Sequence, residues 1–138
     1  EKLHKVRATR PRPLLDDKVV CAWQGMAISA FANAARALAA PDAPTHAAFP
    51  IDGVATSEYL QCAVRTARFT RQHLWDPHTR TLRRSFRLSP SAVPGFADDY
   101  AQLVSGLIDL YSAGGGLEWL RWAVELQARM ADLFWDPV

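Results

Sequence analysis

Apolar residues recur along this chain with the spacing of α-helices in four stretches. Residues 17–40 are apolar around most of the helix circumference, which predicts a central helix packed on nearly all sides. Residues 56–74 carry one apolar stripe with arginines and glutamines opposite it, as is typical of a surface helix with one buried face. Two further helices are expected at 96–112 and 117–134, because the glycines 114–116 between them can end a helix and turn the chain back.

Prolines mark the segments that join these helices. Residues 1–16 contain two prolines, so we expect an extended leading segment and not a helix. Residues 41–55 hold three prolines and a glycine, which predicts a loop. The stretch 75–94 predicts a tight turn, a short strand near 82–88 and a Ser/Pro loop.

The second and fourth predicted helices are copies of each other at an offset of 60 residues. YLQCAVRTARFTRQHLWDP and WLRWAVELQARMADLFWDP share six identical positions, and both close on Trp-Asp-Pro. The first and third helices correspond more loosely, through GMAISAF and GLIDLYS. The chain is therefore predicted to form two helical hairpins, about 17–77 and 96–137, each made of an inner and an outer helix.

Repeated hairpins bury their faces against neighbouring repeats, so two of them predict a larger array. The long connection with a strand favours a closed α/α toroid over a linear solenoid. We expect an all-α fold in which residues 1–138 are part of one toroid domain, with a short β-hairpin or strand between the two hairpins. Trp75 and Trp135, which repeat at the outer-helix ends, are expected to be packing anchors.

The composition is that of a folded chain without a membrane span. Hydrophobic residues make up 49% of it, yet polar residues interrupt every apolar stretch before the ~18 residues that a span requires. Cys21 and Cys62 lie outside any CxxC or Cys/His spacing, which indicates reduced thiols and neither a disulfide framework nor a zinc site. No initiator Met or leader opens the chain and it stops inside the second Trp-Asp-Pro motif, so we expect both ends to be cut. A cytoplasmic or mitochondrial location is favoured.

The charge is unevenly distributed along the chain. Residues 1–87 hold 14 Lys/Arg against 7 Asp/Glu, whereas residues 88–138 hold 2 against 7. A polyanionic partner for the first half and two oppositely charged surfaces that face each other are both consistent with this distribution. Because no aromatic residues alternate with the arginines on one face, nucleic acid is not the favoured partner.

Two groups of motifs carry a resemblance to a known family. The first group is Arg12-Pro13, Asp16-Asp17-Lys18 and Ala22-Trp23-Gln24-Gly25, and the second is Gly95-Phe96-Ala97-Asp98-Asp99-Tyr100-Ala101 with Leu110-Tyr111. They resemble the carboxy-terminal region of the spermatogenesis-associated protein 20 and thioredoxin-domain-containing family, with Gln24 in place of the family's Asn. The resemblance implies a six-hairpin α/α toroid, similar in fold to glycosidases and sugar 2-epimerases. It also implies a preceding thioredoxin-like domain, which this chain does not contain.

Two acidic clusters are expected to open the inner helices on the same face of the toroid, one at Asp16 and Asp17 and the other at Asp98 and Asp99. Glycoside hydrolysis needs a pair of carboxyl groups, one as acid and one as base or nucleophile. Asp17 and Asp99 are therefore the first candidates for catalysis, with Asp16 and Asp98 as second choice. The aromatic residues nearby suit stacking on sugar rings, and the candidate ligand-binding residues are Lys18, Trp23, Gln24, Phe96 and Tyr100.

Each of these residues also has a structural interpretation. An Asp at a helix start caps free N–H groups, which is worth about 0.5–2 kcal/mol without any catalysis. Gly25 and Gly106, in mid-helix, favour close helix packing over a ligand. A polar stripe on the third helix faces either a lumen or solvent, and its members are Asp98, Gln102, Ser105, Asp109 and Ser112.

Two functional hypotheses follow, and the sequence does not decide whether the protein is an enzyme. In the first, the toroid binds a sugar-like small molecule, with a glycosidase-like or epimerase-like reaction and no cofactor or metal. In the second, it is a non-catalytic interaction scaffold or a redox-linked regulatory protein, whose partners are the remaining hairpins and a thioredoxin-like domain. No Ser/His/Asp or Cys/His catalytic arrangement is visible, because the four histidines fall on loops or outer-helix ends.

Overall fold

The computed structural model describes residues 2–39 and 56–136, and these are mostly helical. The helices are α1 (Lys2–Ala8), α2 (Cys21–Ala39), α3 (Thr56–His73), α4 (Ala97–Ser112) and α5 (Leu117–Phe134). The all-α class is confirmed, and the last two helices lie within a residue of the predicted bounds. The loop predicted at 41–55 lies outside the described residues.

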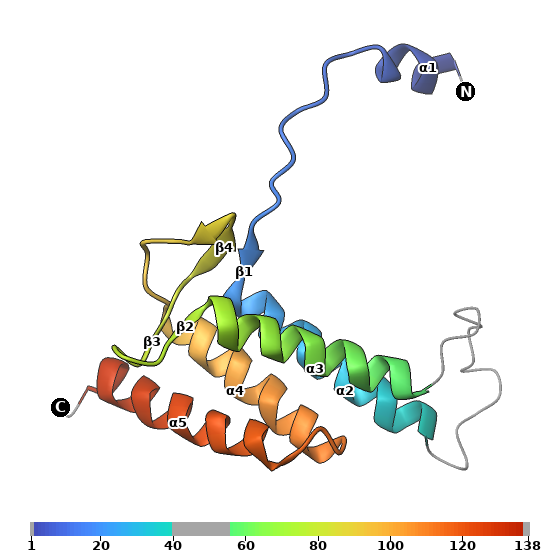
Figure 1. Cartoon of the computed structure of the whole chain (residues 1–138). Helices are drawn as coiled ribbons and strands as arrows, with labels where there is room; N and C mark the ends of the chain where they lie inside the picture. The colour runs from blue at the N-terminus through green and yellow to red at the C-terminus, as the bar shows by residue number, and fades with distance from the viewer. Residues whose placement is uncertain (1, 40–55, 137–138) are drawn as a thin grey trace.

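Helices α2 and α4 form the central pair of the body. α3 packs on α2 and α5 packs on α4, so two helical hairpins lie side by side (Figure 1). The first and third predicted helices are thus the inner ones, as the repeat suggested. The buried core joins all four helices, and its large members include Ile28, Leu103, Leu107, Leu110, Trp122 and Leu126.

The central pair is parallel and unusually close. A Cβ built on Gly25 would lie 2.4 Å from the backbone carbonyl of Gln102, and one on Gly106 would lie 2.3 Å from the carbonyl oxygen of Gly25. Neither position can hold a side chain without moving the backbone. The prediction that both glycines permit close helix packing is confirmed.

Short strands lie just before α2 and between the two hairpins. They are β1 (Val19–Val20), β2 (Trp75–Asp76), β3 (Thr81–Leu82), β4 (Ser85–Arg87) and β5 (Ser89–Pro90). The antiparallel pair β2–β3 forms one small sheet, and the order β1-β4-β5 forms the other. The single strand predicted near 82–88 is therefore two strands, β3 and β4, and β1, just before α2, pairs with β4.

The leading segment departs from the prediction in its first half. Residues 2–8 are helical, although none of their side chains is buried, and this helix stands away from the four-helix body (Figure 1). The prolines at 11 and 13 disfavour a helix at their own positions and at the residue before each, but KLHKVRA lies upstream of them and contains good helix formers. From Pro11 onward the segment has no helix until Cys21, as expected.

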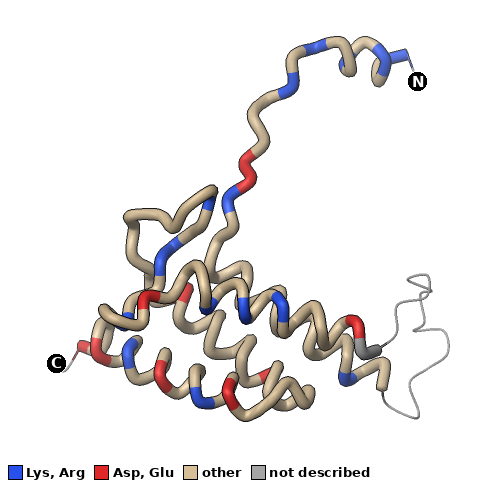
Figure 2. Tube along the Cα trace, in the orientation of Figure 1, with Lys and Arg blue, Asp and Glu red and all other residues tan. Residues whose placement is uncertain are grey.

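The uneven charge distribution is partly explained by ion pairs between the two halves of the chain. Arg84 pairs with Asp98 and Asp99, and Arg80 lies 3.8 Å from Glu125. Figure 2 shows that the body carries both signs, whereas the basic residues of the leading segment lie apart from it. Facing surfaces of opposite charge therefore exist within this chain.

Candidate functional site

Asp99, a leading catalytic candidate, lies fully buried where the two central helices begin. Its Oδ1 accepts the N–H of Ala22 at 2.9 Å, and its Oδ2 accepts the N–H of Phe96 at 2.9 Å. Nη1 of Arg84 donates to the same Oδ2 at 2.8 Å. The donors belong to the start of α2, the start of α4 and the stretch that holds strands β2 to β5, residues 75–90, which we call the strand segment. One carboxylate therefore joins three parts of the chain.

Arg84 links this buried carboxylate to the surface. Its guanidinium lies 3.2 Å from both carboxylate oxygens of Asp98 and 5.1 Å from the centre of the Phe96 ring. The hydrogen bond with Asp99 raises the pKa of Arg84 above its ordinary value, so the guanidinium stays positively charged. The sequence showed Arg84 as one of several arginines, and no local signal distinguished it, because its partners lie 14 and 15 residues away.

The other acidic cluster does not open a helix. Helix α2 begins at Cys21, because Val19 and Val20 pair with β4 instead. Asp16 is exposed and pairs with Lys18 at 3.4 Å, while Asp17 pairs with Arg87. The prediction that both clusters begin inner helices is therefore right for the second and wrong for the first.

Asp17 and Asp99 are held in different surroundings. The Asp17 side chain is half exposed and the Asp99 side chain has no exposed area. Each is paired with a different arginine, Arg87 for Asp17 and Arg84 for Asp99. Their catalytic roles stay predictions.

Tyr100 and Gln24 are less accessible than a ligand-binding role requires. Tyr100 is fully buried, its Oη accepts the N–H of Leu82 at 2.9 Å, and its ring meets Phe134 edge-on. Burial raises the pKa of Tyr100, so its hydroxyl is neutral at physiological pH. Gln24 is partly buried on α2. Tyr100 in this position cannot stack on a ligand.

Trp23 and Phe96 are both exposed, but they lie on different sides of the helix pair. Trp23 is 61% exposed. Since each residue of a helix advances by about 100°, Trp23 points roughly 160° away from Gly25, which faces α4. Phe96 instead lies against Arg84. The structure therefore brings Phe96, Asp98 and Asp99 together around Arg84, whereas Lys18 and Asp16 pair with each other.

The polar stripe of α4 lies on the exposed side and joins α2 at one point. The Ser29 hydroxyl and the Asn33 amide both donate to Oδ2 of Asp109, the amide at 3.1 Å. Gln102 and Ser105 are exposed on the same stripe. Asp109 thus ties the central helices together farther from their amino ends than Asp99 does.

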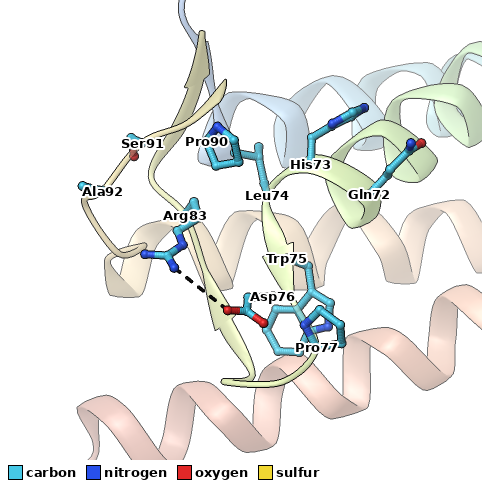
Figure 3. A pocket seen from close by; sticks show the side chains of 10 residues that line it. All are labelled: Gln72, His73, Leu74, Trp75, Asp76, Pro77, Arg83, Pro90, Ser91 and Ala92. Carbon is cyan, nitrogen blue, oxygen red and sulfur yellow. Dashed lines mark ion pairs between the residues drawn. The ribbon is translucent and has the colours of Figure 1, made fainter. Parts of the chain in front are cut away.

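A pocket of about 620 Å³ that sequence reasoning missed lies between the end of α3 and the strand segment (Figure 3). Arg83 and Asp76 point toward each other across it, 4.0 Å apart, and Ser91 comes from the loop opposite (Figure 3). Its lining residues are Gln72, His73, Leu74, Trp75, Asp76, Pro77, Arg83, Pro90, Ser91 and Ala92. Three separate stretches build it, so no sequence motif predicts it.

Cys21 and Cys62 have the character of structural thiols. Burial raises the pKa of the Cys21 thiol far above its ordinary value. The Sγ of Cys62 accepts from Nη2 of Arg65 at 3.0 Å. Within residues 2–39 and 56–136, no three His, Cys, Asp or Glu side chains come together as metal ligands.

None of the described helices, α1 to α5, combines the length and the apolar character needed to cross a bilayer.

Comparison with known proteins gives relatives across nearly all of the chain. Mouse spermatogenesis-associated protein 20 is 34% identical over 145 residues, which cover 99% of this chain. The human protein of that name is 32% identical over 144 residues. The chain is thus homologous, over nearly its whole length, to one segment of spermatogenesis-associated protein 20. The family resemblance seen in the Asp-Asp-Lys and Gly-Phe motifs is thereby confirmed.

The family relatives are much longer proteins. This chain spans 16% of the length of mouse and human spermatogenesis-associated protein 20. A nematode relative, Uncharacterized protein B0495.5 of Caenorhabditis elegans, is 34% identical, and the chain spans 17% of it. No protein-family model matches the chain. The names of these relatives state no reaction and no ligand.

Proposed function

We propose that this chain is a two-hairpin section of a larger α/α toroid and that it acts as an interaction scaffold. The observation that carries the proposal is the difference in burial between the two repeated tryptophans. Trp75 is 8% exposed, whereas Trp135 is 78% exposed. The same motif is thus packed in the first hairpin and uncovered in the second.

Trp75 packs on the outer helix of the next hairpin, and Trp135 has no such helix beside it among the described residues. The Trp75 ring meets the Trp122 ring of α5 nearly edge-on, with 6.4 Å between ring centroids. The guanidinium of Arg71 lies over the Trp122 ring. The end of the first outer helix therefore packs on the outer helix of the next hairpin. By the repeat, Trp135 has the same role toward the outer helix of a third hairpin.

The central helices have one filled side and one open side each. Gly25 and Gly106 occupy the filled sides. On the open side of α2 lie Trp23 and small residues at helical spacing, and on the open side of α4 lies Ile108, which is exposed. Relatives about six times as long have enough chain to cover both sides. The partners proposed here are the neighbouring hairpins, with a thioredoxin-like domain elsewhere in the longer protein.

The scaffold role also fits the surroundings of Asp99. A carboxylate that holds two backbone N–H groups and an arginine must lose those bonds to transfer a proton. Breaking a buried pair of this kind costs about 3–5 kcal/mol. Asp99 is therefore assigned to the architecture and not to catalysis.

Hydroxyl-radical footprinting of the longer protein tests the array. Trp135 and Trp23 are expected to be protected as strongly as Trp75, because neighbouring hairpins cover them. His78, which is exposed on the turn after β2, is the internal control for an uncovered side chain. Oxidation of Trp135 and Trp23 at the rate of His78 would refute the array.

A second candidate function is the binding of a sugar-like molecule at the exposed group Phe96, Arg84 and Asp98. It is favoured by an aromatic ring beside two charged groups, with Asp98 57% exposed. Phe96→Ala and Asp98→Asn should each weaken binding of a monosaccharide by the longer protein. Asp132→Asn, equally exposed on α5, is the matched control. Unchanged binding in the first two variants would exclude this function, and any hydrolysis that survives Asp17→Asn and Asp99→Asn would exclude these two as its acid and base.

A further inference from the structure

The pocket between α3 and the strand segment has the features of a small-molecule site. Its volume of about 620 Å³ falls within the roughly 300–1,000 Å³ of ligand clefts, and apolar side chains with a few polar groups line it. The exposed Pro77 and Pro90 supply apolar surface. The polar groups that face each other across it are Arg83 and Asp76 (Figure 3).

Arg83 has unused hydrogen-bonding capacity. Its backbone is fixed, because its N–H donates to the carbonyl of Leu74 at 2.8 Å. Its side chain is 34% exposed, and its ion pair with Asp76 is at 4.0 Å, longer than a hydrogen bond. The adjacent Arg84 is the contrast, since its guanidinium bonds two carboxylates and lies over an aromatic ring.

Asp76 is a fixed anion. Its Oδ1 accepts the N–H groups of His78 at 2.9 Å and of Thr79 at 3.3 Å. Hydrogen bonds from Thr79 and His78 hold the pKa of this carboxyl below its ordinary value. Its other oxygen, Oδ2, faces Arg83.

His73 lines the pocket, and its ring packs on two phenylalanine rings. Its ring lies 4.7 Å from the Phe69 ring and 5.0 Å from the Phe86 ring, measured between centroids. The charged groups that can meet a ligand are therefore one guanidinium, of Arg83, and one carboxylate, of Asp76, which lie 4.0 Å apart.

We propose that this pocket binds a small zwitterion, namely an α-amino acid with an apolar side chain. The carboxylate of the ligand pairs with Arg83, its ammonium pairs with Asp76, and its apolar part lies on Pro77 and Pro90. A simple anion fits less well, because Asp76 repels it, and a simple cation is repelled by Arg83. The loose ion pair leaves room for two ligand groups that each meet an opposite charge.

Isothermal titration calorimetry of the longer protein with L-leucine tests this proposal. 4-Methylpentanoate lacks the amino group and 3-methylbutylamine lacks the carboxylate, so each should bind at least about tenfold more weakly than leucine. Arg83→Gln and Asp76→Asn should weaken leucine binding by a similar factor, and the Asn side chain still accepts the turn hydrogen bonds. Arg121→Gln, an exposed arginine on α5, should leave it unchanged.

Three results would overturn the inference. They are the absence of saturable binding for leucine and the other apolar amino acids, equal binding of 4-methylpentanoate and leucine, and unchanged leucine binding in Arg83→Gln. The comparison of the three ligands uses the unmodified protein, so it decides the question even where a variant does not fold. The outcome is independent of the array, which the footprinting of Trp135 tests.

Discussion

Replacing Asp99 by Ala removes the acceptor that joins the two helical hairpins. The buried N–H of Ala22 and the partly buried N–H of Phe96 lose their partner, and Arg84 loses its shortest hydrogen bond. An unsatisfied buried donor costs about 1–3 kcal/mol, and breaking a buried ion pair costs about 3–5 kcal/mol. Because Arg84 is partly exposed and keeps Asp98, we expect a loss near the lower limit, about 3 kcal/mol in the free energy of unfolding.

Asp98→Asn is the matched control for this variant. Asp98 is the adjacent residue, carries the same charge and pairs with the same arginine, but it is mostly exposed. An exposed ion pair contributes about 0–1 kcal/mol. Urea denaturation of both variants, followed by circular dichroism, gives the two differences in unfolding free energy. Equal losses for Asp98→Asn and Asp99→Ala, or a loss below about 1 kcal/mol for Asp99→Ala, would refute the reasoning.

Three further predictions follow from the same structure. Gly106→Ala should destabilise the fold by about 3 kcal/mol or more, because the new Cβ meets the carbonyl of Gly25, whereas the exposed Ser105→Ala should be neutral; thermal melts compare the two. The free energy of unfolding should fall as pH rises above about 9, because burial raises the pKa values of Cys21 and Tyr100 in the folded state while the unfolded chain releases those protons. Tyr100→Phe should make this decline less steep when the free energy of unfolding is measured from pH 8 to 11. The isolated 138-residue chain should be unstable or self-associate through the open sides of α2 and α4, and a stable monomer in light scattering would contradict this.

The hairpin repeat and most helix bounds could be predicted from the sequence because they depend on local periodicity, whereas the start of α2 lies four residues later than predicted because Val19 and Val20 pair with β4. The apolar spacing and the glycines 114–116 placed α4 and α5 within a residue of their bounds. The short helix at 2–8 was missed because proline acts only on its neighbours, and β1 was missed because its partner strand lies 66 residues away.

The sequence by itself determined the all-α class, the doubled hairpin, the close approach at Gly25 and the family motifs. Only the tertiary structure decided which acid is buried and which is exposed. Asp99 and Asp17 are both aspartates in acidic pairs, yet a side chain's role depends on donors that come from distant parts of the chain, such as Ala22 and Arg84. Likewise Trp75 and Trp135 share one motif, and their different burial follows from whether a neighbouring outer helix is present to cover the ring.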